Sequence, residues 1–166
     1  MTHLCQDDRV KTDDPLAHTE LTILLGLAFQ VVLQEFVQRT SDAGYPDLRP
    51  VHGMVFQALK ATGATSTELA EHLGVTKQAA GQIVDDLEKR GYVSRQPHPE
   101  GGRRRLVVLT ERAVEHLAVA GQVLHRLEAQ LAGNLGDADL AGLRGELARL
   151  VRELTGDTVP PLRPVW

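Results

Sequence analysis

Seven histidines and one cysteine are the side chains that most readily hold a metal ion or react. His116 and His125 are nine residues apart, on opposite sides of one expected helix, and no two histidines are three or four residues apart. The single cysteine, Cys5, excludes an internal disulfide and any site with several cysteines. With no basic neighbour before Arg9, its thiol is expected to be inert, and the alternative is a sensor of peroxide or thiols. We therefore predict no metal site and no cofactor.

Enzyme motifs are also missing from the sequence. It contains no glycine-rich phosphate loop and no Gly-x-Ser-x-Gly turn that would present a nucleophilic serine. No carboxylates or histidines stand at the spacing of a metal-dependent hydrolase. The sequence therefore predicts a protein that is not an enzyme.

The charge is distributed in a way that favours an acidic binding partner. The net charge is −4, but residues 1–42 carry seven acidic and three basic side chains. Residues 76–112 carry eight basic and five acidic side chains. A local basic surface on an acidic chain is compatible with binding nucleic acid.

Residues 65–87 have the pattern of two short helices joined by a tight turn. Thr65 and Glu68 form a capping box, in which a hydroxyl and a carboxylate satisfy free backbone donors at a helix start. Gly74 suits a left-handed turn, and Thr76 is a good N-cap for the second helix. Apolar residues can fill the angle between the helices, namely Leu69, Leu73, Val75, Ala80 and Ile83.

The first turns of the second helix carry Thr76, Lys77, Gln78 and Gln82. A helix fits the major groove of DNA, where an amide side chain can both donate and accept at a base edge. The neighbouring Ala79, Ala80 and Gly81 offer few polar groups, so DNA shape is expected to contribute to recognition. The alternative is that this face is only solvated.

A β-hairpin with a basic tip should follow, because residues 92–96 and 106–109 read as strands joined by a loop rich in Pro and Gly. The loop ends in Arg103, Arg104 and Arg105, which could contact phosphates or a minor groove. Consecutive residues alternate in direction on a strand, so at least one of the three should face elsewhere. The alternative is a charged tip that keeps the hairpin soluble.

Long amphipathic helices are expected on both sides of this region. Apolar residues recur at helical spacing from Leu16 to about Thr40, and a short helix follows the break at 41–46. Thr110 can cap a helix that ends where Gly133 interrupts it, and Asp137 can cap a last one ending at Gly156. No apolar run approaches the roughly eighteen residues that a membrane span needs, so we expect a cytoplasmic protein that does not contact a membrane.

Three segments, at these spacings, resemble the MarR family of bacterial winged helix-turn-helix regulators: Leu-Ala-Glu-His-Leu-Gly-Val-Thr, Asp-Leu-Glu-Lys-Arg-Gly-Tyr-Val and Arg-Arg-Leu-Val-Val-Leu-Thr. The likeness covers about 16–154 and implies a homodimer that binds a pseudo-palindromic operator, often released by small molecules or oxidants. In that family the wing usually carries an acid two positions before a key arginine. Arg103 matches the arginine, but Gly101 stands at the acid's position, with Glu100 one place earlier.

The predicted fold is mainly α with a small β-hairpin wing, a winged helix-turn-helix with a helical dimerisation region from both ends of the chain. We expect tails at 1–14 and 156–166 around a MarR-like domain at 15–155, with dimerisation helices at 15–40 and 111–155 and the winged lobe at 47–110. The function expected is a transcriptional regulator, with a repressor favoured; the alternative is a winged-helix module that binds proteins. The expected DNA contacts are Thr65, Ser66, Thr76, Lys77, Gln78, Gln82, Arg95, Arg103, Arg104 and Arg105.

Two further sites are expected. A small aromatic or apolar acid is placed by the resemblance near His18, Phe36, His52 and Phe56; partly buried structural histidines are the alternative for His18 and His52. The dimer contacts are expected at Leu21, Leu24, Leu143, Leu147, Leu150 and Leu154.

Overall fold

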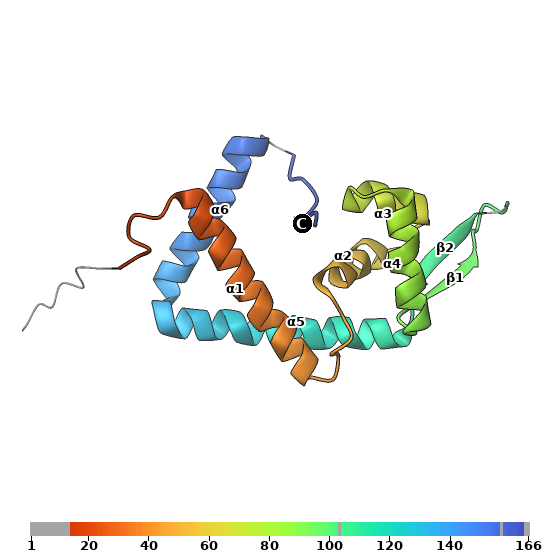
Figure 1. Ribbon diagram of the computed structural model, residues 1–166, viewed down its shortest axis with the longest axis horizontal. Helices are drawn as coiled ribbons and strands as arrows, with labels where there is room; N and C mark the ends of the chain where they lie inside the picture. Colours follow the sequence, from red (N-terminus) through yellow and green to blue (C-terminus); the bar gives the residue numbers. More distant parts are fainter. Residues whose placement is uncertain (1–13, 103, 157, 165–166) are drawn as a thin grey trace, which may run out of the picture. The chain divides into compact units, whose positions relative to one another are not determined.

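The computed structural model describes residues 14–102, 104–156 and 158–164 (Figure 1). The described elements are α1 (Leu21–Asp42), α2 (Pro50–Leu59), α3 (Ser66–Leu73), α4 (Lys77–Lys89), β1 (Val93–Pro97), β2 (Arg105–Leu109), α5 (Glu111–Leu135) and α6 (Asp137–Thr155). The chain divides into two units, 1–35 and 36–166, so the boundary falls within α1. The mainly helical fold with one hairpin that the sequence predicts is confirmed.

The core of the second unit lies between α2, α3, α4 and the hairpin. Its largest buried side chains come from each of these elements, and the start of α5 closes it. The fully buried members include Val55, Phe56, Leu69, Leu73, Val84, Leu87, Tyr92 and Val107. Burying these apolar surfaces is the main force that fixes the angle between α3 and α4.

The helix-turn-helix forms through the local signals that the sequence carries. The Glu68 backbone N–H donates to the Thr65 hydroxyl at 3.3 Å, and the Thr65 backbone N–H donates to the Glu68 carboxylate at 2.7 Å. Gly74 ends α3 in the left-handed region at φ +67°. The Thr76 hydroxyl accepts from the Ala79 backbone N–H at 3.1 Å and caps α4. The capping box, the turn and the second cap are thus confirmed.

The wing is an antiparallel pair in which Arg95 lies opposite Val107 and Gln96 opposite Leu106. A third short segment, which the sequence reading missed, joins this sheet. Ala64 bridges Val107 through backbone hydrogen bonds of 3.1 and 2.8 Å. A single bridging residue leaves no alternating pattern, so strand periodicity could not reveal it.

The long helices begin and end at different residues from those expected. The first helix starts at Leu21, whereas Leu16 lies in a turn, and α5 continues through Gly133 to Leu135. Asp137 is not the cap of α6. The N-cap is Gly136, which has no side chain that could cap the helix. Asp137 is instead the first helical residue, where its negative charge faces the positive end of the helix dipole.

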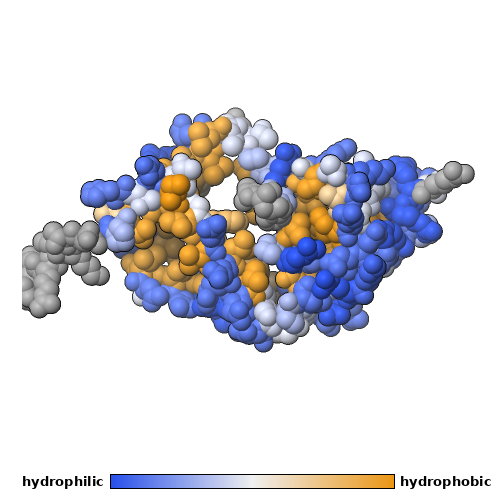
Figure 2. Space-filling model, viewed as in Figure 1, coloured by the Kyte–Doolittle hydropathy of each residue, from blue (hydrophilic) through white to orange (hydrophobic). Residues whose placement is uncertain are grey.

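The two outer helices, each taken by itself, expose large apolar side chains. On α1 the exposed fractions of Leu21 and Val31 are 60% and 64%. On α6 no residue is buried, and Leu143 and Leu154 are 50% and 79% exposed. Figure 2 shows apolar surface over α6 and the first half of α1.

Helix α1 corrects the expectation that no segment could span a membrane. It is 22 residues long with a window of mean hydropathy 1.6, enough by length and composition to cross a bilayer. One such helix is weak evidence for a membrane protein, because a core helix of a soluble protein and a signal sequence near the N-terminus meet the same criteria of length and composition.

Candidate nucleic-acid interface

The first turns of α4 present the predicted base-reading side chains to solvent. Thr76, Lys77, Gln78 and Gln82 are all exposed. The opposite face of α4 is fixed by Ala80, Val84 and Leu87, none more than 1% exposed. A rigid helix with a free polar end is the arrangement that enters a major groove.

The other predicted contact residues near this end have different surroundings. Thr65 and Ser66 lie at the start of α3 and are half-buried. The Thr65 hydroxyl donates to the Glu68 carboxylate at 2.9 Å, so the capping box already uses it. The Thr65 backbone N–H also donates to this carboxylate, at 2.7 Å, so the predicted DNA contact of Thr65 would have to compete with the capping box.

The arginines of the wing divide into two kinds. Arg104 donates to the Glu100 carboxylate at 2.7 Å, so Glu100 braces the tip although Gly101 holds the position where the family has its acid. Arg105, the exposed first residue of β2, makes no ion pair with any described residue. Arg103 lies outside the described residues, as does Cys5.

Arg95 is occupied within the protein. Its guanidinium donates to the Asp85 carboxylate at 2.6 Å and also to Glu88, both on α4. The side chain is 27% exposed. Arg95 therefore holds the wing against α4, and two carboxylates already neutralise its charge, whereas Arg104 is paired with a single one.

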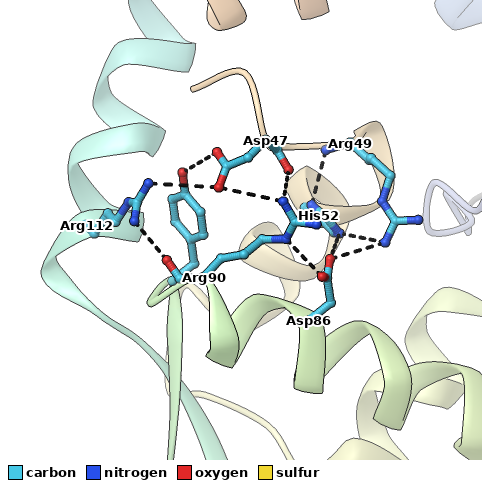
Figure 3. A network of polar contacts seen from close by, with 7 residues as sticks. Asp47, Arg49, His52, Asp86, Arg90 and Arg112 are labelled. Atoms are coloured by element: carbon cyan, nitrogen blue, oxygen red, sulfur yellow. Dashed lines mark hydrogen bonds and ion pairs between the residues drawn. The ribbon is translucent and has the colours of Figure 1, made fainter. Parts of the chain in front are cut away.

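A polar network joins the loop before α2 to the far end of α4 and the start of α5 (Figure 3). Asp47 accepts from the Tyr92 hydroxyl at 3.0 Å, and Arg90 donates to the Asp47 backbone carbonyl at 2.9 Å. Arg112 donates to the Arg90 carbonyl at 2.9 Å, and its Cζ lies 4.4 Å from the centre of the Tyr92 ring. These contacts connect three elements that are distant in sequence.

Asp86 on α4 is the second centre of this network. One carboxylate oxygen accepts from Arg90 Nε at 2.9 Å. The other lies 3.4 Å from both Arg49 Nη2 and His52 Nε2. His52 Nδ1 accepts the Arg49 backbone N–H at 3.1 Å, so a neutral ring carries its proton on Nε2, facing Asp86.

The electrostatics of the network keep His52 neutral and Asp86 charged. Burial, and secondarily the nearby Arg49 charge, lower the pKa of His52 from 6.5 to about 4. The hydrogen bond from Arg90 holds the pKa of Asp86 below its usual value. Burial and the hydrogen bond to Asp47 raise the pKa of Tyr92. At neutral pH the His52 ring is therefore uncharged and the Asp86 carboxylate is ionised.

A cavity of about 230 Å³ lies beside this network, between the end of α1, α2 and α5. Its walls are mainly apolar, from residues such as Phe36, Leu48, Leu117 and Leu124, with Arg49 and Lys60 as the cations. The volume is below the roughly 300–1,000 Å³ typical of drug-sized ligands. It suits a single substituted ring.

Only one of the four residues predicted for this pocket lines it. Phe36 does, whereas His52 and Phe56 have no exposed surface and belong to the core. His18 is exposed in the segment before α1. The residue that the sequence reading missed is His116, which lines the cavity and is 6% exposed, and whose Nδ1 has no hydrogen-bond partner among the described residues.

Comparison with known proteins supports this reading of the fold. The MarR family model matches residues 47–104. A putative transcriptional regulatory protein for the hcr operon of Thauera aromatica is 28% identical over 103 residues, 62% of each chain. A riboflavin kinase of Thermoplasma volcanium is 33% identical over 88 residues, which are 53% of this chain and 38% of the kinase. The chain thus spans less than two thirds of these curated relatives.

Two solved structures cover most of the chain. The transcriptional repressor CouR, bound to a 23-mer DNA duplex, is 28% identical with a TM-score of 0.66, and covers 80% of this chain and 93% of its own. A mutant of MarR from E. coli is 25% identical with a TM-score of 0.66, and covers 80% and 96%.

The fold and the exposed end of α4 define a winged helix-turn-helix protein. The resemblance to the MarR family is confirmed, and the chain is a homologue of MarR-family transcription regulators. That family and fold are those of regulators and not of enzymes, and the partial match to the kinase does not alter this.

Proposed function

We propose that this protein binds double-stranded DNA sequence-specifically as a homodimer and acts as a transcriptional repressor in the cytoplasm. The observation that carries the proposal is the exposed cluster of Thr76, Lys77, Gln78 and Gln82 on the rigid first turns of α4. A basic wing tip with Arg105 accompanies it. The DNA duplex in the CouR structure supports the choice of ligand.

The homodimer is supported by the apolar faces of the outer helices. Leu143, Leu147 and Leu154 are each at least 38% exposed in the single chain, and none of the α6 side chains is buried. A soluble chain rarely leaves contiguous apolar surface of this kind uncovered. Two-fold symmetry of the dimer would place two α4 helices on a pseudo-palindromic operator.

Release by a small effector is supported by the cavity. Arg49 and Lys60 provide positive charge, the remaining walls are mainly apolar, and His116 Nδ1 lacks a partner among the described residues. This combination suits an aromatic acid with a second polar group. A screen of hydroxybenzoates should raise the thermal unfolding temperature and weaken DNA binding; a screen with neither effect would remove the effector from the proposal.

The test of DNA binding is selection of bound fragments from random duplex DNA, followed by footprinting. We expect an enriched inverted repeat whose half-sites are one helical turn apart, about 10 base pairs. Enrichment of no sequence, together with capture of a protein through the same face of α4, would favour the alternative of a protein-binding winged-helix module.

A further inference from the structure

We propose that the C-terminal tail, residues 158–164, is a further DNA contact of each subunit, in which Arg163 binds a phosphate beside the helix-turn-helix. The inference rests on the proposed function and extends it to a segment outside residues 47–104, which the family model matches. The tail follows α6 and returns to α3 on the side away from the wing (Figure 1). The tail, α3 and α4 all belong to the unit 36–166.

Arg163 lies directly against the turn between α3 and α4. A Cβ atom added to Gly74 would come within 2.8 Å of Arg163 Cδ and 2.9 Å of its Nε, so the absence of a side chain at Gly74 leaves room for the arginine. Gly74 is two residues before the Thr76 cap, a backbone distance of at most about 7 Å. The arginine is therefore placed next to the start of α4, where the predicted base contacts begin.

Positive charge gathers at this place. Arg163 is exposed and makes no ion pair with the part of the chain that the structure describes. Lys77 is exposed in the first turn of α4, and the start of this helix is the positive end of its dipole. Positive groups that gather in this way attract an anion. The guanidinium fork of arginine matches the oxygens of a phosphate, so the DNA backbone is the anion that fits.

The arginines of the wing divide differently between internal and external partners. Arg95 is held by two carboxylates of α4, and Arg104 is paired with Glu100. Arg105 on the wing and Arg163 on the tail make no ion pair with any described residue. Contacts to the DNA backbone from the wing and from the tail would fix the angle at which α4 enters the groove, because phosphate contacts set orientation.

The composition of the tail suits an arm that binds through a charge. Residues 160, 161 and 164 are prolines, and proline fixes φ, so the segment loses little conformational entropy when it binds. The exposed fractions of Val159 and Leu162 are 70% and 67%, so apolar burial does not explain why the tail lies against α3. We therefore expect the charge of Arg163 to be the property that matters.

The first experiment measures affinity for the operator selected with the full chain, at several salt concentrations, for that chain and for Arg163→Ala. A dimer would lose two phosphate contacts, so the slope of log affinity against log salt should become smaller by about 1.8. The loss of affinity should then be about twelvefold larger at 50 mM than at 200 mM salt. The preference among single-base variants should not change, because a phosphate contact carries no sequence information.

An unchanged affinity and slope would overturn the proposal. Tighter binding by Arg163→Ala would also overturn it, because the tail would then cover the helix-turn-helix and oppose DNA. If the full chain selects no duplex at all, the proposed function fails. If it selects a duplex that Arg163→Ala binds equally well, only this inference fails.

Two variants guard this measurement. Arg163→Lys keeps the charge and should keep most of the salt slope; a slope as small as that of Arg163→Ala would count against a phosphate contact. Arg126→Ala removes an exposed cation of α5 and so matches the change in net charge. Its affinity and slope should equal those of the parent, and a decrease like that of Arg163→Ala would show that net charge matters and the position of Arg163 does not.

Thermal unfolding separates a DNA contact from a structural role of the tail. Because Arg163 is exposed, Arg163→Ala should unfold at the temperature of the parent. A lower unfolding temperature would assign its weaker binding to a less stable helix-turn-helix and overturn the proposal.

The second experiment locates the tail on the duplex. In a Cys5→Ser background, Leu162→Cys supplies the only cysteine, keeps Arg163 and can be labelled with an iron–EDTA reagent that cleaves nearby DNA. We expect cuts at two positions related by the two-fold symmetry of the operator. Gln122→Cys, at an exposed position of α5, should give none when labelled in the same way. Absence of cuts from position 162, or the same cuts from both positions, would overturn the proposal.

Discussion

Gln78 and Lys77 are neighbours on the exposed end of α4, yet their side chains support different kinds of contact. An amide can form two hydrogen bonds to one adenine, whereas an ammonium group is a point charge that phosphates also attract. Both residues and their exposure could be predicted from sequence, because the Thr76 cap fixes where the helix starts. We therefore propose Gln78 as the side chain that reads a base.

Replacing Gln78 with Ala should relax the preference at one position of each half-site, with a loss of discrimination of about 1–3 kcal/mol. The salt dependence should stay unchanged, because no charge is removed. Titration of the operator and its single-base variants measures this. Gln122→Ala, an exposed glutamine on α5, is the matched control. An unchanged base preference would assign the readout to another side chain.

Arg105→Ala should change the salt dependence of DNA binding and leave the base preference unchanged. Removing a cation that neutralises a phosphate weakens binding to every duplex and reduces the slope of affinity against salt by about 0.9 for each phosphate left without its cation. Arg149, an exposed arginine on α6 paired with Glu146, provides the control. If Arg105→Ala and Arg149→Ala behave alike, Arg105 does not contact the DNA backbone.

The pKa of His52 makes stability depend on pH in a defined window. Its folded pKa of about 4 lies below the ordinary 6.5, so protonation favours the unfolded chain. The contribution of neutral His52 to the free energy of unfolding is fully present above pH 6.5. It falls as the pH drops toward 4, with a slope of up to about 1.4 kcal/mol per pH unit. Urea unfolding at several pH values measures the slope.

His52→Asn is the matched variant for that measurement. It should be less stable at pH 7 but should lose less stability on acidification, since the shifted group is gone. A smaller slope should remain, because burial also lowers the pKa of His116. A variant that keeps the full slope of the parent would assign the acid sensitivity to other groups.

At the scale of secondary-structure elements, the two helices and the turn of the helix-turn-helix, α3 and α4, could be predicted from local signals in the sequence. Capping hydroxyls and Gly74 at φ +67° act over three or four residues, so the sequence shows them directly. The bridge from Ala64 to Val107 and the pairing of Arg49 with Asp86 join residues far apart in the chain. No local pattern encodes them, and the cavity residue His116 was missed for the same reason.

Thr76→Ala should remove the hydroxyl that caps α4 and lower the free energy of unfolding by about 1 kcal/mol. Thr76→Ser keeps the hydroxyl and should stay within a few tenths of a kcal/mol of the parent. Chemical denaturation of both variants tests the pair. Equal stability of the alanine and serine variants would mean that the backbone of α4 does not depend on this cap.

On the scale of the whole molecule, the exposed leucines of α6 lead to a prediction about assembly. Leu147 is 38% exposed in the single chain, so a charge there would be tolerated by a monomer but not by an apolar dimer interface. Leu147→Asp should shift the protein to monomers and lower its thermal stability. Sedimentation at micromolar concentration measures the shift, with Arg149→Asp as a control on the same helix.

A stable dimer of Leu147→Asp, or a stable folded monomer of the parent, would contradict this prediction. The Leu147→Asp variant also separates assembly from DNA binding, because α6 carries none of the residues of the candidate nucleic-acid interface. Loss of operator binding by Leu147→Asp with an intact circular dichroism spectrum would show that two α4 helices are needed together.

The network around Asp47 has a consequence for how the winged lobe can be handled as a part. Asp47 lies just before α2 and Arg112 in the first turn of α5, with 3.9 Å between their charged groups, so side chains link the two ends of the lobe. Arg90 and Tyr92 also donate to Asp47. A lobe whose ends are linked by its own side chains is suited to transplantation, because these links hold the ends together when the lobe is inserted into a loop of a host protein.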